Sequence, residues 1–205
     1  ITVDDVMDEV REQAERDYQL ASGLSQDVET DDSVLRQTSA RLPWLLIGML
    51  GGIGNSMILG NFDTTFAAHP EMALYIPLIG GTGGNVGTQS SALVVQGLAN
   101  SSLDANNTWK QILKESVVAL INATIISMLV YIYNFVRFGP TATVSYSVSL
   151  SLFAVVMFAS IFGTLVPMTL EKLKIDPAIA TGPFISITND IIGMMLYMGI
   201  TVLLS

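Results

Sequence analysis

Asp190 is the residue whose type and position most clearly suggest chemistry. It is an acid within the otherwise apolar stretch 177–204, and an intramembrane carboxylate is costly and normally faces a cavity or the interior of a helix bundle. Helical spacing places Gly182, Ser186 and Gly193 on the same stripe. Oxygen ligands along one helix face suit a hard cation such as Mg²⁺. The same stripe could instead serve close helix packing around a protonated, hydrogen-bonded Asp190.

A single carboxylate is too little to hold a divalent cation alone. Mg²⁺ releases its waters reluctantly and is often held through a mostly intact hydration shell by one or two carboxylates. In a helix spanning 177–204, Asp190 lies near the bilayer midplane, and Pro183 leaves the carbonyl of Ile179 unpaired as a further oxygen ligand. A two-fold dimer would bring two copies of Asp190 to one axis, which predicts a shared ion site.

Two other functions are compatible with Asp190. In a proton- or sodium-coupled divalent cation carrier, its carboxylate would change protonation or ligation between two access states. In a non-transporting membrane scaffold, it would stay protonated and fix helix contacts. We expect no enzyme, because the sequence has no cysteine, a single histidine outside the apolar stretches and no nucleophile–base pair. We expect no nucleic-acid partner, because the net charge is −9 and such a partner needs a basic face.

The second motif is the glycine-rich sequence PLIGGTGGNVGTQSS at 77–91. It is not a phosphate-binding loop, because G-x-x-x-x-G-K-[ST] requires a lysine that is absent here, and G-x-G-x-x-G also fails. Gly80 with Gly84, and Gly83 with Gly87, form pairs of small residues that allow helices to approach closely. A glycine-thinned helix can also line a cavity, and the pattern leaves both interpretations open. The polar side chains in the same turns are Asn85, Thr88 and Gln89.

These residues must be positioned by helices that cross a membrane. Half of the 205 residues are hydrophobic and 13% are charged, whereas soluble domains carry about 25% charged residues. A membrane-spanning helix needs about 20 mostly apolar residues, and five segments qualify. They are residues 43–61, 72–98, 112–138, 144–170 and 177–204. We therefore predict an all-α membrane protein with five transmembrane helices.

The first 40 residues have a different character, since they hold 11 of the 18 acids. Residues 1–22 are expected to form an acidic, soluble helix, and residues 23–33 a polar linker. A cytoplasmic N-terminus leaves only Arg137 outside and places six basic residues inside, in agreement with the positive-inside rule. Those six are Arg36, Arg41, Lys110, Lys114, Lys172 and Lys174. We predict a cytoplasmic segment 1–40 followed by a transmembrane pore domain 41–205.

Two long motifs resemble the MgtE family of magnesium channels, which is related to eukaryotic magnesium carriers. They are IPLIGGTGGNVGTQSS at 76–91 and FASIFGTLVPMTLEKLKIDPAIATGPFISITNDIIG at 158–193. The opening ITVDDVMDEV is similar to the end of the CBS domain pair that precedes the membrane domain, and the acidic helix to the connecting, or plug, helix. The resemblance implies a multi-pass plasma (inner) membrane homodimer with its pore on the two-fold axis. It also implies that N-terminal and CBS domains of the same chain are missing here.

The resemblance further implies a set of site residues. The family's intramembrane magnesium-binding aspartate falls on Asp190, and an acidic turn residue that helps to bind regulatory Mg²⁺ falls on Asp176. Mg²⁺ is thus expected both as the transported ion and as a regulator. Residues expected along the pore or in contact with the hydrated ion are Ser186, Gly182, Gly84, Asn85, Thr88 and Gln89. Regulatory acids are expected at Asp4, Asp5, Asp8, Glu12 and Glu15, although such a charge run is also typical of a solvated helix face.

Two positions depart from the family pattern. Gly182 stands where some relatives have an asparagine, so a side-chain contact to the hydrated ion is expected to be missing there. Ser186 stands where an alanine is expected, which makes this turn more polar.

Overall fold

The computed structural model describes residues 2–100, 102–103, 107–139 and 142–204, and within these ranges all regular secondary structure is helical. The expected all-α membrane protein is therefore confirmed at the level of its fold class. The elements are α1 Val3–Ala21, α2 Val34–Gly60, α3 Asp63–Ala68, the 3₁₀ helix η1 Pro70–Tyr75, α4 Ile76–Ala99, α5 Thr108–Phe138, α6 Thr143–Lys172, the 3₁₀ helix η3 Pro177–Ala180 and α7 Pro183–Leu204.

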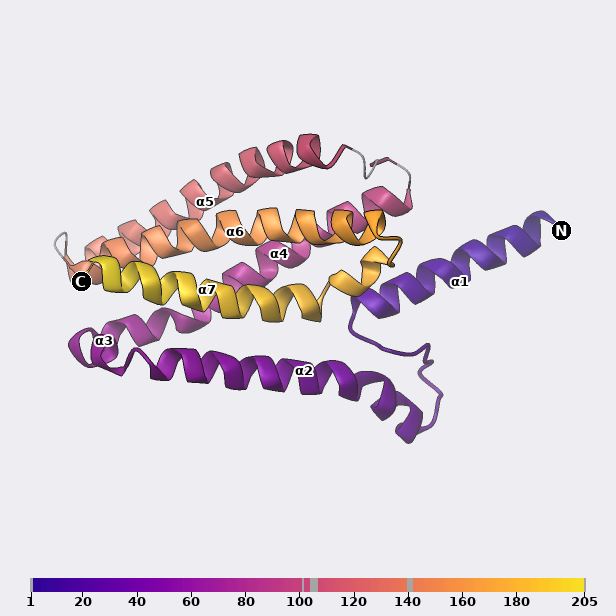
Figure 1. Cartoon of the computed structure of the whole chain (residues 1–205), viewed down its shortest axis with the longest axis horizontal. Helices are drawn as coiled ribbons and strands as arrows, with labels where there is room; N and C mark the ends of the chain where they lie inside the picture. The colour runs from indigo at the N-terminus through magenta and orange to yellow at the C-terminus, as the bar shows by residue number, and fades with distance from the viewer. Residues whose placement is uncertain (1, 101, 104–106, 140–141, 205) are drawn as a thin grey trace.

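Helix α6 is the centre of the bundle. It packs against α4, α5 and α7, while α2 lies along the side of the bundle and packs chiefly against α7 (Figure 1). The buried core between these helices includes Ile79 of α4, Leu152 and Val155 of α6, and Met194 of α7. The hydroxyl of Tyr197 in α7 donates to the main-chain carbonyl oxygen of Met72 in η1 at 2.7 Å, which ties α7 to the segment before α4.

Four helices are long and apolar enough to cross a membrane, by length and composition, among the described residues. They are α2, α5, α6 and α7. The glycine-rich α4 has 24 residues but does not reach the same hydropathy. It nevertheless packs against both α6 and α7 within the bundle. The helix with the weaker hydropathy is therefore more buried by its neighbours than α2 is.

Helix α1 projects away from the bundle (Figure 1). Its first turn is closed by a capping box, in which the Thr2 N–H donates to Asp5 Oδ2 at 2.7 Å and the Asp5 N–H donates to Thr2 Oγ1 at 3.2 Å. After the helix, the Gln19 side chain makes two hydrogen bonds with the main chain of Val28, at 3.0 and 3.1 Å. Helix α1 at Val3–Ala21 thus lies within the residues 1–22 that were expected to be helical.

The predicted helix over 177–204 is wrong at its start. Residues 177–180 form the short η3, the chain then turns at Thr181 and Gly182, and α7 begins at Pro183. Proline is compatible with the first residue of a helix, and Pro183 is the first residue of α7. The prediction that Pro183 leaves the carbonyl of Ile179 unpaired inside a helix is therefore wrong. Asp190 becomes the eighth of the 22 residues of α7, in the half near α1 rather than at the middle.

Candidate cation-binding site

Asp190 lies where α7 packs against the glycine-rich part of α4. A methyl group added at Gly80 would stand 3.4 Å from Asp190 Oδ1, and one added at Gly84 would stand 3.6 Å from the same atom. The carboxylate is half-buried. Within the described part of the chain, it has no hydrogen bond and no ion pair with a basic side chain. The two sequence motifs therefore meet at this carboxylate.

Ser186 lies one turn before Asp190 on the same face of α7. A methyl group at Gly84 would stand only 2.8 Å from Ser186 Oγ, so the absence of a side chain there lets α4 approach both polar groups of α7. The close-packing interpretation is confirmed at Gly84, whereas a methyl group at Gly80 would make only ordinary contacts. Their lining of a water-filled cavity stays a prediction.

Gly83 and Gly87 serve the neighbouring face of α4. A methyl at Gly83 would stand 2.9 Å from Val155 Cγ1 of α6, and a methyl at Gly87 would collide with the side-chain nitrogen of Asn189 on α7. On α6, a methyl group added at Gly163 would collide with the main-chain carbonyl oxygen of Gly87. Glycines on two faces thus allow α4 to fit closely against both α6 and α7.

Asn189 was missed by the sequence interpretation, although it stands next to Asp190. Its side chain is 1% exposed, and neither its Oδ1 nor its Nδ2 has a hydrogen-bond partner in the described structure. It points between α4 and α7 at Gly83 and Gly87. Since a buried amide without a partner is costly, Asn189 is a polar group that the bundle holds next to Asp190 at the expense of stability.

The other predicted residues of α4 are less close to Asp190. Asn85 is exposed and Thr88 is half-buried. Gln89 is exposed and lines a cavity of about 430 Å³ between α4, α5 and α6. Asp190 does not line that cavity, so the structure brings Gly80, Gly84 and Ser186 to the carboxylate but not Gln89.

Gly182 has a structural role that explains why no side chain stands there. Its φ of +49° is left-handed, and a methyl group would collide with the main-chain carbonyl of Ala21 at the end of α1. Gly23 is also left-handed, with φ of +83°, and a methyl there would stand 2.6 Å from Pro183 Cγ. These two glycines bring the end of α1 directly against the first residue of α7.

Asp176 lies at the same end of the bundle. Its Oδ1 accepts the main-chain N–H of Ala178 at 2.8 Å, which caps η3. It lines a cavity of about 430 Å³ together with Asp17 of α1, Glu171 of α6 and Lys174. Three carboxylates and one amine thus border the junction of α1 with the bundle.

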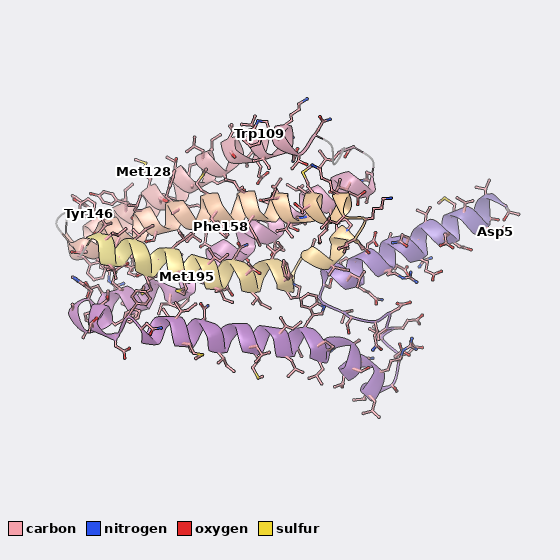
Figure 2. All side chains as sticks on the ribbon, in the orientation of Figure 1. Asp5, Trp109, Met128, Tyr146, Phe158 and Met195 are labelled. Atoms are coloured by element: carbon pink, nitrogen blue, oxygen red, sulfur yellow. The ribbon has the colours of Figure 1, made fainter. Side chains whose placement is uncertain are left out.

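The predicted regulatory acids of α1 are all exposed. Glu15 pairs with Arg11 at 2.9 Å and Glu12 with Arg16 at 3.8 Å, and Asp5 stands at the far tip of the helix (Figure 2). Hydrogen bonds from the main-chain N–H and the hydroxyl of Thr2 to the Asp5 carboxylate lower its pKa. No group of three or more metal-ligating side chains is assembled among the described residues, so regulation by Mg²⁺ stays a prediction.

Glu115 of α5 is a second buried acid that the sequence interpretation did not single out. It is 9% exposed, and its Oε1 accepts the hydroxyls of Ser90 on α4, at 2.7 Å, and of Ser160 on α6. The signal was available, since Glu115 lies within the predicted span 112–138. Its position near the end of that span, next to Lys114, gives it the pattern of an interfacial residue.

Comparison with known proteins places these features in a family. Residues 76–200 match the family model MgtE, described as a divalent cation transporter. Three proteins named magnesium transporter MgtE are similar to almost the entire chain. The relative from Bacillus subtilis (strain 168) is 32% identical over 200 residues, 98% of this chain and 44% of the relative. That from Enterococcus faecalis is 30% identical over 200 residues, with the same coverage. That from Thermus thermophilus is 31% identical over 210 residues, 100% of this chain and 45% of the relative. The chain therefore spans less than half the length of these relatives.

Proposed function

Since this chain belongs to the MgtE family of divalent cation transporters, we propose that it is a magnesium channel. Hydrated Mg²⁺ moves through it across the plasma membrane, down the electrochemical gradient of the ion. Mg²⁺ as the transported ion is supported by three relatives that are named magnesium transporters. A family of transporters also agrees with the expectation that the chain is not an enzyme.

The observation that carries this proposal is the environment of Asp190. Its half-buried carboxylate has no basic partner in the described structure, and the glycines of α4 leave only backbone beside it. A carboxylate without a counter-charge in a membrane helix attracts a cation. Mg²⁺ that keeps its waters needs hydrogen-bond acceptors rather than a tight cage, and Ser186 adds a hydroxyl oxygen one turn away.

A homodimer completes the site. Two Asp190 carboxylates on a two-fold axis carry a charge of about −2, which balances one divalent cation. In this arrangement α4 crosses the membrane together with α2, α5, α6 and α7, which gives five transmembrane helices in each subunit. Its 24 residues span about 36 Å at 1.5 Å per residue, enough for a hydrocarbon core of about 30 Å. The N-terminus and α1 then lie in the cytoplasm, in agreement with the positive-inside rule.

Regulation belongs to the cytoplasmic end of the molecule in this proposal. Mg²⁺ bound near Asp176 would screen the repulsion between this carboxylate and those of Asp17 and Glu171, which border the same cavity. The ion would then hold the exposed acidic α1 against the start of α7, where Gly182 already meets Ala21. The exposed acids Asp4, Asp5, Asp8, Glu12 and Glu15 would contribute the remaining negative surface.

Flux measurements on the reconstituted chain test the transport proposal. Liposomes loaded with a Mg²⁺-sensitive dye should show uptake that is lost in Asp190→Asn and Asp190→Ala. Asp63→Asn serves as the matched control, because Asp63 is an exposed acid of α3 at the other end of the bundle. Size-exclusion profiles establish that each variant stays folded. Undiminished flux through Asp190→Asn would refute the assignment.

The driving force separates the channel from a coupled carrier. Channel flux follows only the Mg²⁺ gradient and the membrane potential. In a proton- or sodium-coupled carrier, in which Asp190 changes protonation or ligation, the rate would instead follow an imposed pH or Na⁺ gradient at constant Mg²⁺.

A further inference from the structure

The buried acid Glu115 is not used by the proposed pore. It belongs to α5 and reaches the junction of three helices, where Ser90 and Ser160 both donate to its Oε1. The two serine oxygens are themselves 3.0 Å apart. Glu115 thus lies on the side of α4 that faces α5 and α6, whereas Asp190 lies on the side that faces α7.

The charge of Glu115 has no partner within the described chain. No ion pair with a lysine or arginine involves it there, and both serine hydrogen bonds go to Oε1, which leaves Oε2 for another donor. A carboxylate this deeply buried is costly unless a positive group or several donors meet it. The cavity of about 430 Å³ that Glu115 lines gives such a partner access to the carboxylate.

A second cavity of about 410 Å³ adjoins the first, and its charged lining residues are basic. Lys110 and Lys114 line it, and Lys114 and Gln111 line both cavities. The combined space is therefore lined by two ammonium groups, those of Lys110 and Lys114, and by the carboxylate of Glu115. A free divalent cation is a poor occupant of such a space because Lys114 repels it, and a purely anionic ligand would meet the carboxylate.

The surroundings of the two cavities are those of a membrane surface. Leu93 and Val118, which line the cavity of Glu115, are 64% and 42% exposed. Trp109, next to Lys110 at the start of α5, is 71% exposed (Figure 2). A tryptophan beside lysines at the end of an apolar helix is typical of the headgroup level of a bilayer. Polar groups of both signs next to exposed apolar side chains fit a zwitterionic amphiphile.

We propose that these adjoining cavities bind a phospholipid whose headgroup ends in a primary amine. The ammonium group donates to Oε2 of Glu115, the phosphate lies against Lys110 and Lys114, and the acyl chains run along Leu93 and Val118. A primary ammonium has three N–H donors for the carboxylate, whereas a trimethylated choline has none and is larger. The site is independent of the ion path and rests on none of the pore assignments.

Native mass spectrometry of the purified 205-residue chain tests this site. The probes are phosphatidylethanolamine, its mono- and dimethylated forms, phosphatidylcholine and phosphatidylglycerol, each with the same acyl chains. We expect one retained phosphatidylethanolamine per chain, with about tenfold weaker retention of phosphatidylcholine, because a charge-assisted hydrogen bond is lost. Retention should fall stepwise with methylation. Equal retention of all headgroups, or stronger retention of phosphatidylglycerol, would overturn the proposal.

Two variants test whether Glu115 causes the preference for a primary-amine headgroup. Glu115→Gln keeps the acceptor for the two serines and should abolish the preference for the primary amine. Glu29→Gln, which removes an exposed acid of the segment between α1 and α2, should retain it. If Glu115→Gln does not fold, the methylation series on the unsubstituted chain still decides. A further control adds magnesium chloride alone. If it displaces the lipid and stabilises the unsubstituted chain but not Glu115→Gln, the cavities hold a metal site instead, and the proposal is overturned.

Discussion

Replacement of Gly163 by alanine should separate α4 from α6. The added methyl group would overlap the main-chain carbonyl oxygen of Gly87 and would stand 3.1 Å from both its Cα and its carbonyl carbon. Ordinary contacts begin near 3.4 Å, and a backbone cannot rotate away as a side chain can. Overpacking of this kind costs about 1–3 kcal/mol. Alanine also gains about 1 kcal/mol of helix propensity over glycine, so the measurement needs a control with the same gain.

Gly81→Ala provides that control, because a methyl group at Gly81 meets no atom within 4 Å. The difference between the two variants should therefore be the packing cost alone, or about 2–12 °C in the midpoint of thermal unfolding for a chain of this size. Intrinsic fluorescence of the two tryptophans in detergent reports the transition. Equal midpoints for Gly163→Ala and Gly81→Ala would refute the close approach of α4 and α6.

Two further predictions concern α1. Gly182→Ala should detach the end of α1 from α7, because it adds both backbone strain and a collision with Ala21. Faster proteolysis within residues 22–33 would report this detachment. Gly139→Ala is strained but meets no neighbouring atom, so it should leave the proteolysis rate unchanged. The lowered pKa of Asp5 stabilises the first turn of α1 above the ordinary carboxyl range, and this stabilisation is lost as pH falls through the lowered pKa. Protection of the amides in that turn, taken against their intrinsic exchange rate at each pH, should therefore fall below about pH 4, and unchanged protection would contradict the capping role.

The long helices could be predicted because their signals are local. Apolar composition and helical spacing fixed α5 and α6 to within a few residues of the expected 112–138 and 144–170. The break before α7 could not be predicted in this way. It depends on the left-handed Gly182 meeting the end of α1, a contact between segments about 160 residues apart in the sequence. A proline in an apolar stretch gives no indication of whether it lies inside a helix or begins one.

The same distinction separates the two acids. Asp190 was recognisable because a charge in the middle of an apolar stretch has few explanations. Glu115 was not, because an acid beside a lysine near a helix end usually faces water. Its burial depends on Ser90 and Ser160, which come from two other helices. Asn189 was overlooked for a related reason, since only the glycines of α4 reveal that its side chain is enclosed.

The central claim is that two Asp190 carboxylates share one divalent cation, and counting bound ions tests it most directly. Titration of the purified protein with Mn²⁺, followed by electron paramagnetic resonance, gives the number of ions bound per chain. Because other acids can also bind Mn²⁺, the decisive quantity is the difference between the unsubstituted chain and Asp190→Asn. Our account predicts a difference of one ion for every two chains. A difference of one ion per chain, or none, would contradict it.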